Sequence, residues 1–97
     1  MLVLVTYDVN VTTRAGQKRL RHIAKVCLDH GVRVQNSVFE CEIDPAQWVQ
    51  LKAALLHIFD PTQDSLRFYM LGKRGAEKVE HCGAKPTFNP LHSTLIL

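Results

Sequence analysis

The sequence predicts an α+β domain in which two helices cover one face of an antiparallel sheet. Two observations lead to this class. Apolar residues change their period along the chain, from the continuous run of a buried strand to the spacing of a helical face and back again. Residues that begin and end helices fall between these segments. The chain has 97 residues, which is enough for one domain.

The first strand is expected over residues 2–7 and ends at Asp8. Its residues are apolar or β-branched, which is typical of a strand inside a sheet. A helix is then expected over residues 14–30, with Thr13 as its N-cap. Gly31 is expected to end this helix as a C′ glycine, a position that usually takes the left-handed conformation. The apolar face of the helix contains Leu20, Ile23, Ala24, Cys27 and Leu28.

Residues 32–43 are expected to be extended again. The polar group at 35–37 predicts a tight bend or bulge that divides this segment into two short strands. A second helix then begins at Asp44, which can cap it, with Pro45 at the first helical position and Gln47 able to bond back to the cap. Its buried face is expected to contain Trp48, Leu51, Leu55, Ile58 and Phe59.

Asp60–Pro61 should end the second helix, and a strand with alternating apolar residues is expected over residues 65–71. With right-handed crossovers, this order gives a ferredoxin-like βαββαβ sandwich with both helices on one face. We expect residues 1–77 to form this domain. Residues 78–97 are expected to add one or more edge strands that pair with the other protomer or a partner. The alternative is a frayed apolar tail.

The composition fits a folded globular protein, with 46% hydrophobic and 22% charged residues. The formal net charge of +3 permits a nucleic-acid partner without requiring one. Three dispersed cysteines without a CxxC pair argue against a disulfide framework and are typical of a reducing compartment. No apolar run reaches membrane-spanning length, so we expect a cytoplasmic protein with no membrane partner.

Asp8 is the candidate catalytic and metal-binding residue, because it follows a buried strand at an edge of the sheet. From spacing alone, a second interpretation carries more weight: Asp8 only shapes the turn into the first helix. Mg²⁺ is usually held by one or two carboxylates with water and phosphate, and the next acid in the sequence is Asp29. A two-fold homodimer would bring two copies of Asp8 to one axis, where they could hold Mg²⁺ or Mn²⁺.

Basic residues recur along the first helix on the side away from its apolar face. A stripe of this kind is often only a solvated helix face. In a dimer, however, it would form a groove suited to the phosphate backbone of nucleic acid. The candidate nucleic-acid-binding residues are Arg14, Lys18, Arg19, Arg21 and Lys25 on the helix, and Arg33 beyond it.

Three motifs resemble those of one known family. Residues 5–9, which include Tyr7 and Asp8, resemble the Tyr-Asp-Ile/Val signature of the CRISPR-associated Cas-two family. Residues 31–40 resemble its Gly-x-Arg-x-Gln-x-Ser-Val-Phe segment, and Asp60-Pro61-x-x-Asp64-Ser65 before a strand is also typical of it. The resemblance extends from Met1 to about residue 71.

This resemblance implies a ferredoxin-like homodimer in which Asp8 binds the metal opposite its dimer mate. It places Tyr7, Ser37 and Phe39 near the same site. It also implies two kinds of function that the sequence does not separate. One is a Mg²⁺- or Mn²⁺-dependent endonuclease acting on single-stranded RNA or double-stranded DNA. The other is a scaffold that bridges the adaptation integrase during spacer acquisition.

We favour the scaffold as the biological role, with endonuclease activity as a conditional property. Outside this family, a toxin-type ribonuclease of similar fold is the alternative. The chain also departs from the family pattern just after the first strand. Many members carry further acids there, whereas this chain has Asn10, Thr12 and Thr13.

Overall fold

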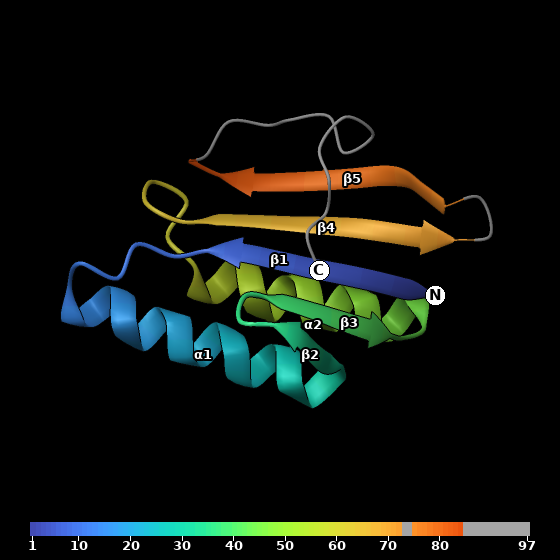
Figure 1. The fold of residues 1–97 in the computed structure, drawn as a ribbon, viewed down its shortest axis with the longest axis horizontal. Coiled ribbons are helices and arrows are strands. Elements are labelled where there is room, and N and C mark those ends of the chain that lie inside the picture. Colours follow the sequence, from blue (N-terminus) through green and yellow to red (C-terminus); the bar gives the residue numbers. More distant parts are fainter. Residues whose placement is uncertain (73–74, 85–97) are drawn as a thin grey trace.

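The structure is a computed structural model and describes residues 1–72 and 75–84. Two helices and five strands follow one another along the chain, as Figure 1 shows. Their order is β1 (Leu2–Asp8), α1 (Arg14–His30), β2 (Val32–Gln35), β3 (Val38–Glu42), α2 (Pro45–Ile58), β4 (Ser65–Gly72) and β5 (Gly75–Gly83). The predicted α+β class and its βαββαβ order are confirmed, and β5 extends the sheet.

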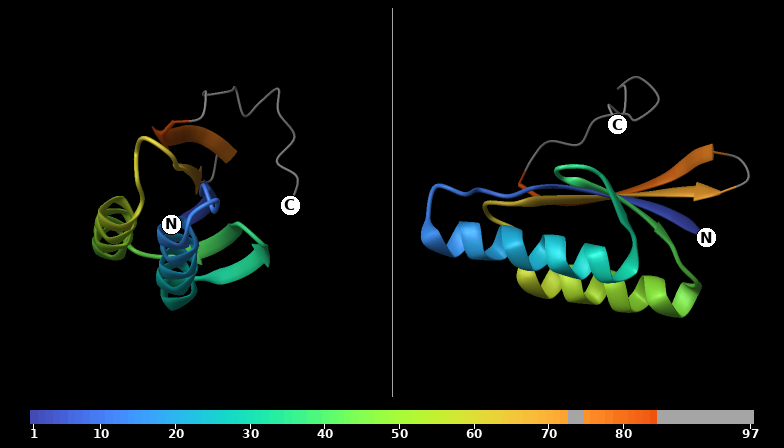
Figure 2. Two further views of the ribbon diagram at one scale, coloured as in Figure 1. Left: turned by 90° about the vertical axis from the view of Figure 1, so that its left-hand side faces the viewer. Right: turned by 60° about the horizontal axis from the view of Figure 1, so that its bottom comes forward.

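The sheet has the strand order β2-β3-β1-β4-β5, and every neighbouring pair is antiparallel. β1 is therefore the central strand, and both helices lie against one face of the sheet (Figures 1 and 2). β5 pairs with β4 of the same chain, so the expected boundary between residues 77 and 78 falls inside this strand. The expected strand at residues 93–97 lies outside the described residues.

The core fills the space between the helices and the sheet. Burial of one large apolar side chain contributes about 1.5–3 kcal/mol, so this layer supplies the main stabilisation of the fold. Two aromatic contacts lie within it: Tyr7 stacks on Phe39 at 6.1 Å, and Trp48 meets Phe68 edge-on at 5.0 Å. Fully buried core residues are Val3, Val5, Ile23, Cys27, Phe39, Cys41, Leu51, Leu55, Leu66 and Phe68.

Both predicted helix starts are confirmed by their caps. The Thr13 hydroxyl accepts a hydrogen bond of 3.0 Å from the backbone N–H of Gly16. At the second helix, Asp44 Oδ1 accepts from the Gln47 N–H at 2.7 Å, and Gln47 Oε1 accepts from the Asp44 N–H at 2.9 Å. This reciprocal pair is the capping box that the sequence indicates.

Gly31 ends α1 as predicted, but its backbone does not take the left-handed conformation that is usual for a C′ glycine. Its φ of −164° and ψ of −163° are extended, and its N–H donates to the Cys27 carbonyl at 2.9 Å. A side chain would nevertheless not fit there. A Cβ atom on Gly31 would lie 2.2 Å from the Glu40 carbonyl oxygen and 2.6 Å from Cys41 Sγ. Close approach to β3, and not a left-handed turn, accounts for this glycine.

The predicted division of residues 32–43 is confirmed, with a register shift between Arg33 and Gln35. β4 is more deeply buried than its alternation indicates. Leu66 and Phe68 face the helices, as expected, but Arg67 and Tyr69 on the other face are only 5% and 1% exposed. Both faces of this strand are therefore shielded from solvent.

The three cysteines are all free thiols. Burial raises the pKa of the Cys27 thiol to about 12 and that of the Cys41 thiol to about 11. Cys82, in β5, is half-buried, and burial also raises its pKa.

Within residues 1–72 and 75–84, neither helix is long and apolar enough to cross a membrane.

Candidate active site and nucleic-acid face

Asp8 is the last residue of β1 and is exposed. It pairs in register with Ser65, the first residue of β4, so it lies where the central strand ends and its neighbour begins. Successive side chains of a strand point to opposite faces, and Tyr7 packs in the core beneath the sheet. Asp8 therefore belongs to the face of the sheet that the helices leave uncovered.

A single chain offers only part of a metal site at this position. Within the part of the chain that the structure describes, no three His, Cys, Asp or Glu residues are grouped so that they could hold a metal ion. An exposed carboxylate fits one ligand position of Mg²⁺ or Mn²⁺, whose other ligands are commonly water and phosphate. Asp8 offers one such carboxylate.

The residues expected near the site are brought together by β1 and β3. The Ser37 carbonyl accepts from the Tyr7 N–H at 3.1 Å, and the Tyr7 hydroxyl donates to the Asn36 carbonyl at 3.3 Å. Burial raises the pKa of Tyr7, although a hydrogen bond with Arg33 opposes the rise. Tyr7 and Phe39 lie on the helix side of the sheet, so they support the strand that carries Asp8 from beneath.

Asp64 is the residue at this end of the sheet that the sequence analysis did not single out. Its side chain is fully buried. Its carboxylate accepts from Arg19 Nε at 2.8 Å and Nη2 at 3.3 Å, from the Asn10 N–H at 3.0 Å and from the Asp60 N–H at 2.9 Å. Burial alone would raise the pKa of Asp64, but these hydrogen bonds outweigh it and hold the pKa below its usual 3.8.

The Asp64 network fixes the loop that follows Asp8. Asn10, two residues after Asp8, is held through its N–H by Asp64. Its own side-chain oxygen accepts from the N–H and hydroxyl of Thr12 at 3.0 and 2.8 Å, which closes a local turn. Gly16 packs directly against the same loop, because a Cβ there would lie 1.9 Å from the Asn10 carbonyl oxygen.

The basic residues fall into different environments. Arg14, Lys18, Arg21 and Lys25 are exposed along α1, as a nucleic-acid face requires. Arg19 differs, because its guanidinium is directed inward to Asp64 and only 16% of its side chain is exposed. Its first role is thus to neutralise a buried carboxylate. Arg33 is exposed on β2, with its guanidinium carbon 5.1 Å from the centre of the Phe39 ring.

Fold and site together define a small ferredoxin-like domain with a carboxylate at the end of its central strand and a basic first helix. The family model described as CRISPR associated protein Cas2 matches residues 1–79, and the chain belongs to this family. The alternative of a toxin-type ribonuclease assumed a protein outside this family, so family membership argues against it.

Relatives of this chain are named as nucleases. The CRISPR-associated endoribonuclease Cas2 of Chlorobaculum tepidum is 61% identical over 97 residues, which is 100% of both chains. The CRISPR-associated endonuclease Cas2 of Halalkalibacterium halodurans is 53% identical over 92% of this chain and 93% of its own. The crystal structure of Streptococcus pyogenes Cas2 at pH 6.5 superposes with a TM-score of 0.70 and 63% identity, over 75% of this chain and 88% of that one.

Proposed function

We propose that this chain serves CRISPR spacer acquisition as a cytoplasmic homodimer that binds nucleic acid and bridges the adaptation integrase. We further propose that it has metal-dependent endonuclease activity on RNA or double-stranded DNA. Membership of the Cas2 family supports the process, and the names of the relatives support the nuclease. The observation that carries the catalytic part is the exposed carboxylate of Asp8 at the end of the central strand.

Symmetry would complete the site. A two-fold axis beside β1, on the face without helices, would bring the Asp8 carboxylates of two protomers together. Each would supply one oxygen ligand to Mg²⁺ or Mn²⁺. When bound, such an ion would lower the pKa of a coordinated water and stabilise negative charge on the scissile phosphate. The Asp64 network holds the loop after Asp8, so the carboxylate stands on a fixed support.

The scaffold role is favoured by the residues that follow the strand. Asn10 and Thr12 stand where many family members carry acids, and their side chains bond to each other within the turn. They add no negative charge beside Asp8. A single carboxylate from each protomer makes a weak metal site, so cleavage would be conditional while binding through the basic helix would not depend on it.

The decisive experiment on cleavage compares Asp8→Asn with Glu40→Gln, an exposed acid on the adjacent strand β3. In Mg²⁺ or Mn²⁺, Asp8→Asn should lower the rate of RNA or duplex cleavage by at least about 100-fold, because a metal ion contributes several kcal/mol to transition-state stabilisation. Glu40→Gln should cleave normally. Light scattering should show the same dimer for all three proteins. Equal cleavage by wild type and Asp8→Asn would reject the catalytic role.

Nucleic-acid binding by α1 is tested through its salt dependence. Reversing the charge of Arg14 and Lys18 together should weaken duplex binding and lower the slope of log K against log salt by about 0.9 for each lost phosphate contact. The measurement is a fluorescence anisotropy titration at several salt concentrations. An unchanged slope in the double variant would contradict a phosphate-binding role for this helix.

A further inference from the structure

α1 and α2 lie side by side on one face of the sheet (Figure 2). An open cleft of about 580 Å³ is lined by α1 and by the last turn of α2. All the residues that line it belong to the two helices. Its size is within the range of about 300–1,000 Å³ that is usual for ligand pockets. It can therefore accept a few side chains of a partner, but not a folded domain.

The cleft combines an apolar floor with a basic rim. Its apolar lining comes from Ala15 and Val26 on α1 and from Ile58 at the end of α2. Lys18 and Lys25, two helical turns apart, lie along its α1 side, and His22 and His57 add imidazoles on either side.

Two further charged side chains line the same cleft. Arg19 is already paired with Asp64, so most of its charge is neutralised. Asp29, near the end of α1, is the carboxylate among the lining residues. Lys18 and Lys25 outnumber Asp29, so the rim carries a net positive charge without a contribution from Arg19.

α1 carries its exposed charges in two rows. Lys18 and Lys25 line the cleft, whereas Arg14 and Arg21, which are also seven residues apart, do not. A phosphate backbone laid along this helix would be expected to use both rows, and it has no use for an apolar floor. Lys18 and Lys25 therefore stand beside an apolar lining that a peptide segment can bury and a phosphate backbone cannot.

We propose that the cleft between α1 and α2 binds an acidic, amphipathic peptide segment of a partner protein. Apolar side chains of the segment would pack on Ala15, Val26 and Ile58, and its carboxylates would pair with Lys18 and Lys25. The binding mode is the familiar one in which an amphipathic segment lies in an apolar groove with charges along its edge. This surface is separate from Asp8, and its use does not depend on cleavage.

The test uses the full chain and a labelled synthetic peptide with leucines at helical spacing and glutamates at the remaining positions. A second peptide has lysines in place of the glutamates. Fluorescence anisotropy should show binding of the acidic peptide in the micromolar range, about −8 kcal/mol at 1 μM, and binding of the basic peptide at least about tenfold weaker.

Four variants locate the binding. Ala15→Glu places a carboxylate on the floor and should weaken binding at least about tenfold. This change suits the first turn of a helix, so folding should be preserved. Ala15→Gln is the size control and should bind more tightly than Ala15→Glu. Lys18→Glu should weaken binding at least about tenfold, while Arg21→Glu, with the same change in charge on the other row, should change it by less than about twofold.

Three results would overturn the proposal. Equal weakening by Lys18→Glu and Arg21→Glu would mean that the peptide responds only to overall charge. Equal binding of the acidic and basic peptides would remove the electrostatic argument. Equal binding of the acidic peptide by Ala15→Glu and Ala15→Gln would show that the peptide does not use the apolar lining of the cleft. Duplex binding and cleavage are measured separately, so their failure would leave this result interpretable.

Discussion

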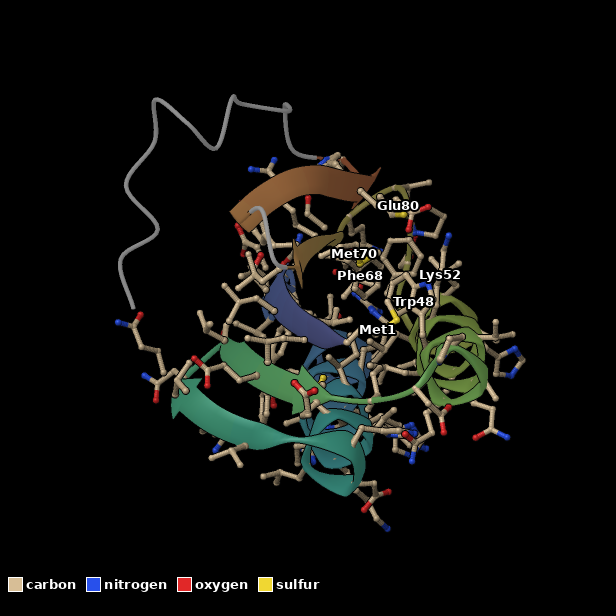
Figure 3. The ribbon with its side chains drawn as sticks, turned by 90° about the vertical axis from the view of Figure 1, so that its right-hand side faces the viewer. Met1, Trp48, Lys52, Phe68, Met70 and Glu80 are labelled. Carbon is tan, nitrogen blue, oxygen red and sulfur yellow. The ribbon has the colours of Figure 1, made fainter. Side chains whose placement is uncertain are left out.

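The two ends of the sheet are held together in different ways. At the Asp8 end, where β1 finishes and β4 begins, the buried carboxylate of Asp64 connects the loop after β1, helix α1 and the turn before β4. At the Met1 end, where β1 begins, the elements are held together by side-chain packing and by exposed charged side chains. Figure 3 views that end and shows Trp48, Phe68 and Met70 beside Lys52 and Glu80.

The contacts at the Met1 end are individually replaceable. Trp48 packs on Phe68, and Lys52 lies 5.8 Å from the Trp48 ring while it pairs with Glu80 of β5. The α-ammonium of Met1 donates to the Ile43 carbonyl at 2.7 Å. Both members of the Lys52–Glu80 pair are about one-third or more exposed, so solvent can replace either one.

The two ends of the sheet differ in how much folding stability is lost when one contact is removed. Solvent cannot replace a partner in the Asp64 network, because a buried charge or donor that loses its partner bears the full cost of desolvation. The carboxylate proposed for catalysis stands at this more tightly determined end. Precise placement of a functional group requires such support from the surrounding residues.

Asp64→Asn should have the largest effect on stability. The amide keeps the size of the side chain but leaves Arg19 without its counter-ion, so unfolding free energy should fall by about 3 kcal/mol, as for other broken buried pairs. Urea unfolding with an unchanged m-value measures this loss. Glu40→Gln, at an exposed carboxylate, is the control and should change stability by less than about 0.5 kcal/mol.

The same variant has a predicted dependence on pH. The pKa of Asp64 lies below 3.8 in the folded protein, so its ionised form stabilises the fold above that pH, and the contribution is lost as pH falls through the folded pKa. The stability gap between wild type and Asp64→Asn should therefore be fully present at neutral pH and narrow below 3.8. A gap that is constant down to the acid transition would contradict the ionised network.

Gly16→Ala should have an intermediate effect at the same end. In an ordinary helix this change stabilises by about 1 kcal/mol. Here the new methyl group would meet the Asn10 carbonyl oxygen at 1.9 Å, so the loop after Asp8 must move. We expect a net loss of about 1–3 kcal/mol. A gain in thermal stability would show that this loop is freely adjustable.

Lys52→Met should have the smallest effect, because it lies at the Met1 end. The methionine keeps the unbranched stem of the side chain and removes the ammonium, which pairs with Glu80 and lies over the Trp48 ring. Exposed pairs contribute about 0–1 kcal/mol, and salt screens them. Urea unfolding at low and high salt should show a small difference that disappears at high salt. If Lys52→Met lowered the unfolding free energy as much as Asp64→Asn, the proposed difference between the two ends of the sheet would be wrong.

The sequence predicted the features that depend on local chemistry. The caps at Thr13 and Asp44 are confirmed, because each bonds to a backbone group three residues away. Asp8 was found because it directly ends an apolar run. Its role in binding metal, and the dimer that would complete the site, stay predictions.

The features that the sequence did not reveal depend on distant contacts. Asp64 and Arg19 are 45 positions apart, so nothing near either residue indicates that they meet in the interior. The acid before β4 was noticed as part of a motif, but burial could not be inferred from it. Likewise, a glycine after a helix suggests a turn, and only the approach of β3 shows that Gly31 is needed for space.

The buried thiols of Cys27 and Cys41 can serve as probes of transient opening of the core. A thiolate, and not a thiol, reacts with alkylating reagents, and Cys27 and Cys41 are both enclosed and held protonated at neutral pH. They should become reactive only when the helices separate from the sheet. The rate of maleimide labelling of Cys27 and Cys41 would then measure how often the core opens in the wild-type protein, without any substitution at the Asp8 end.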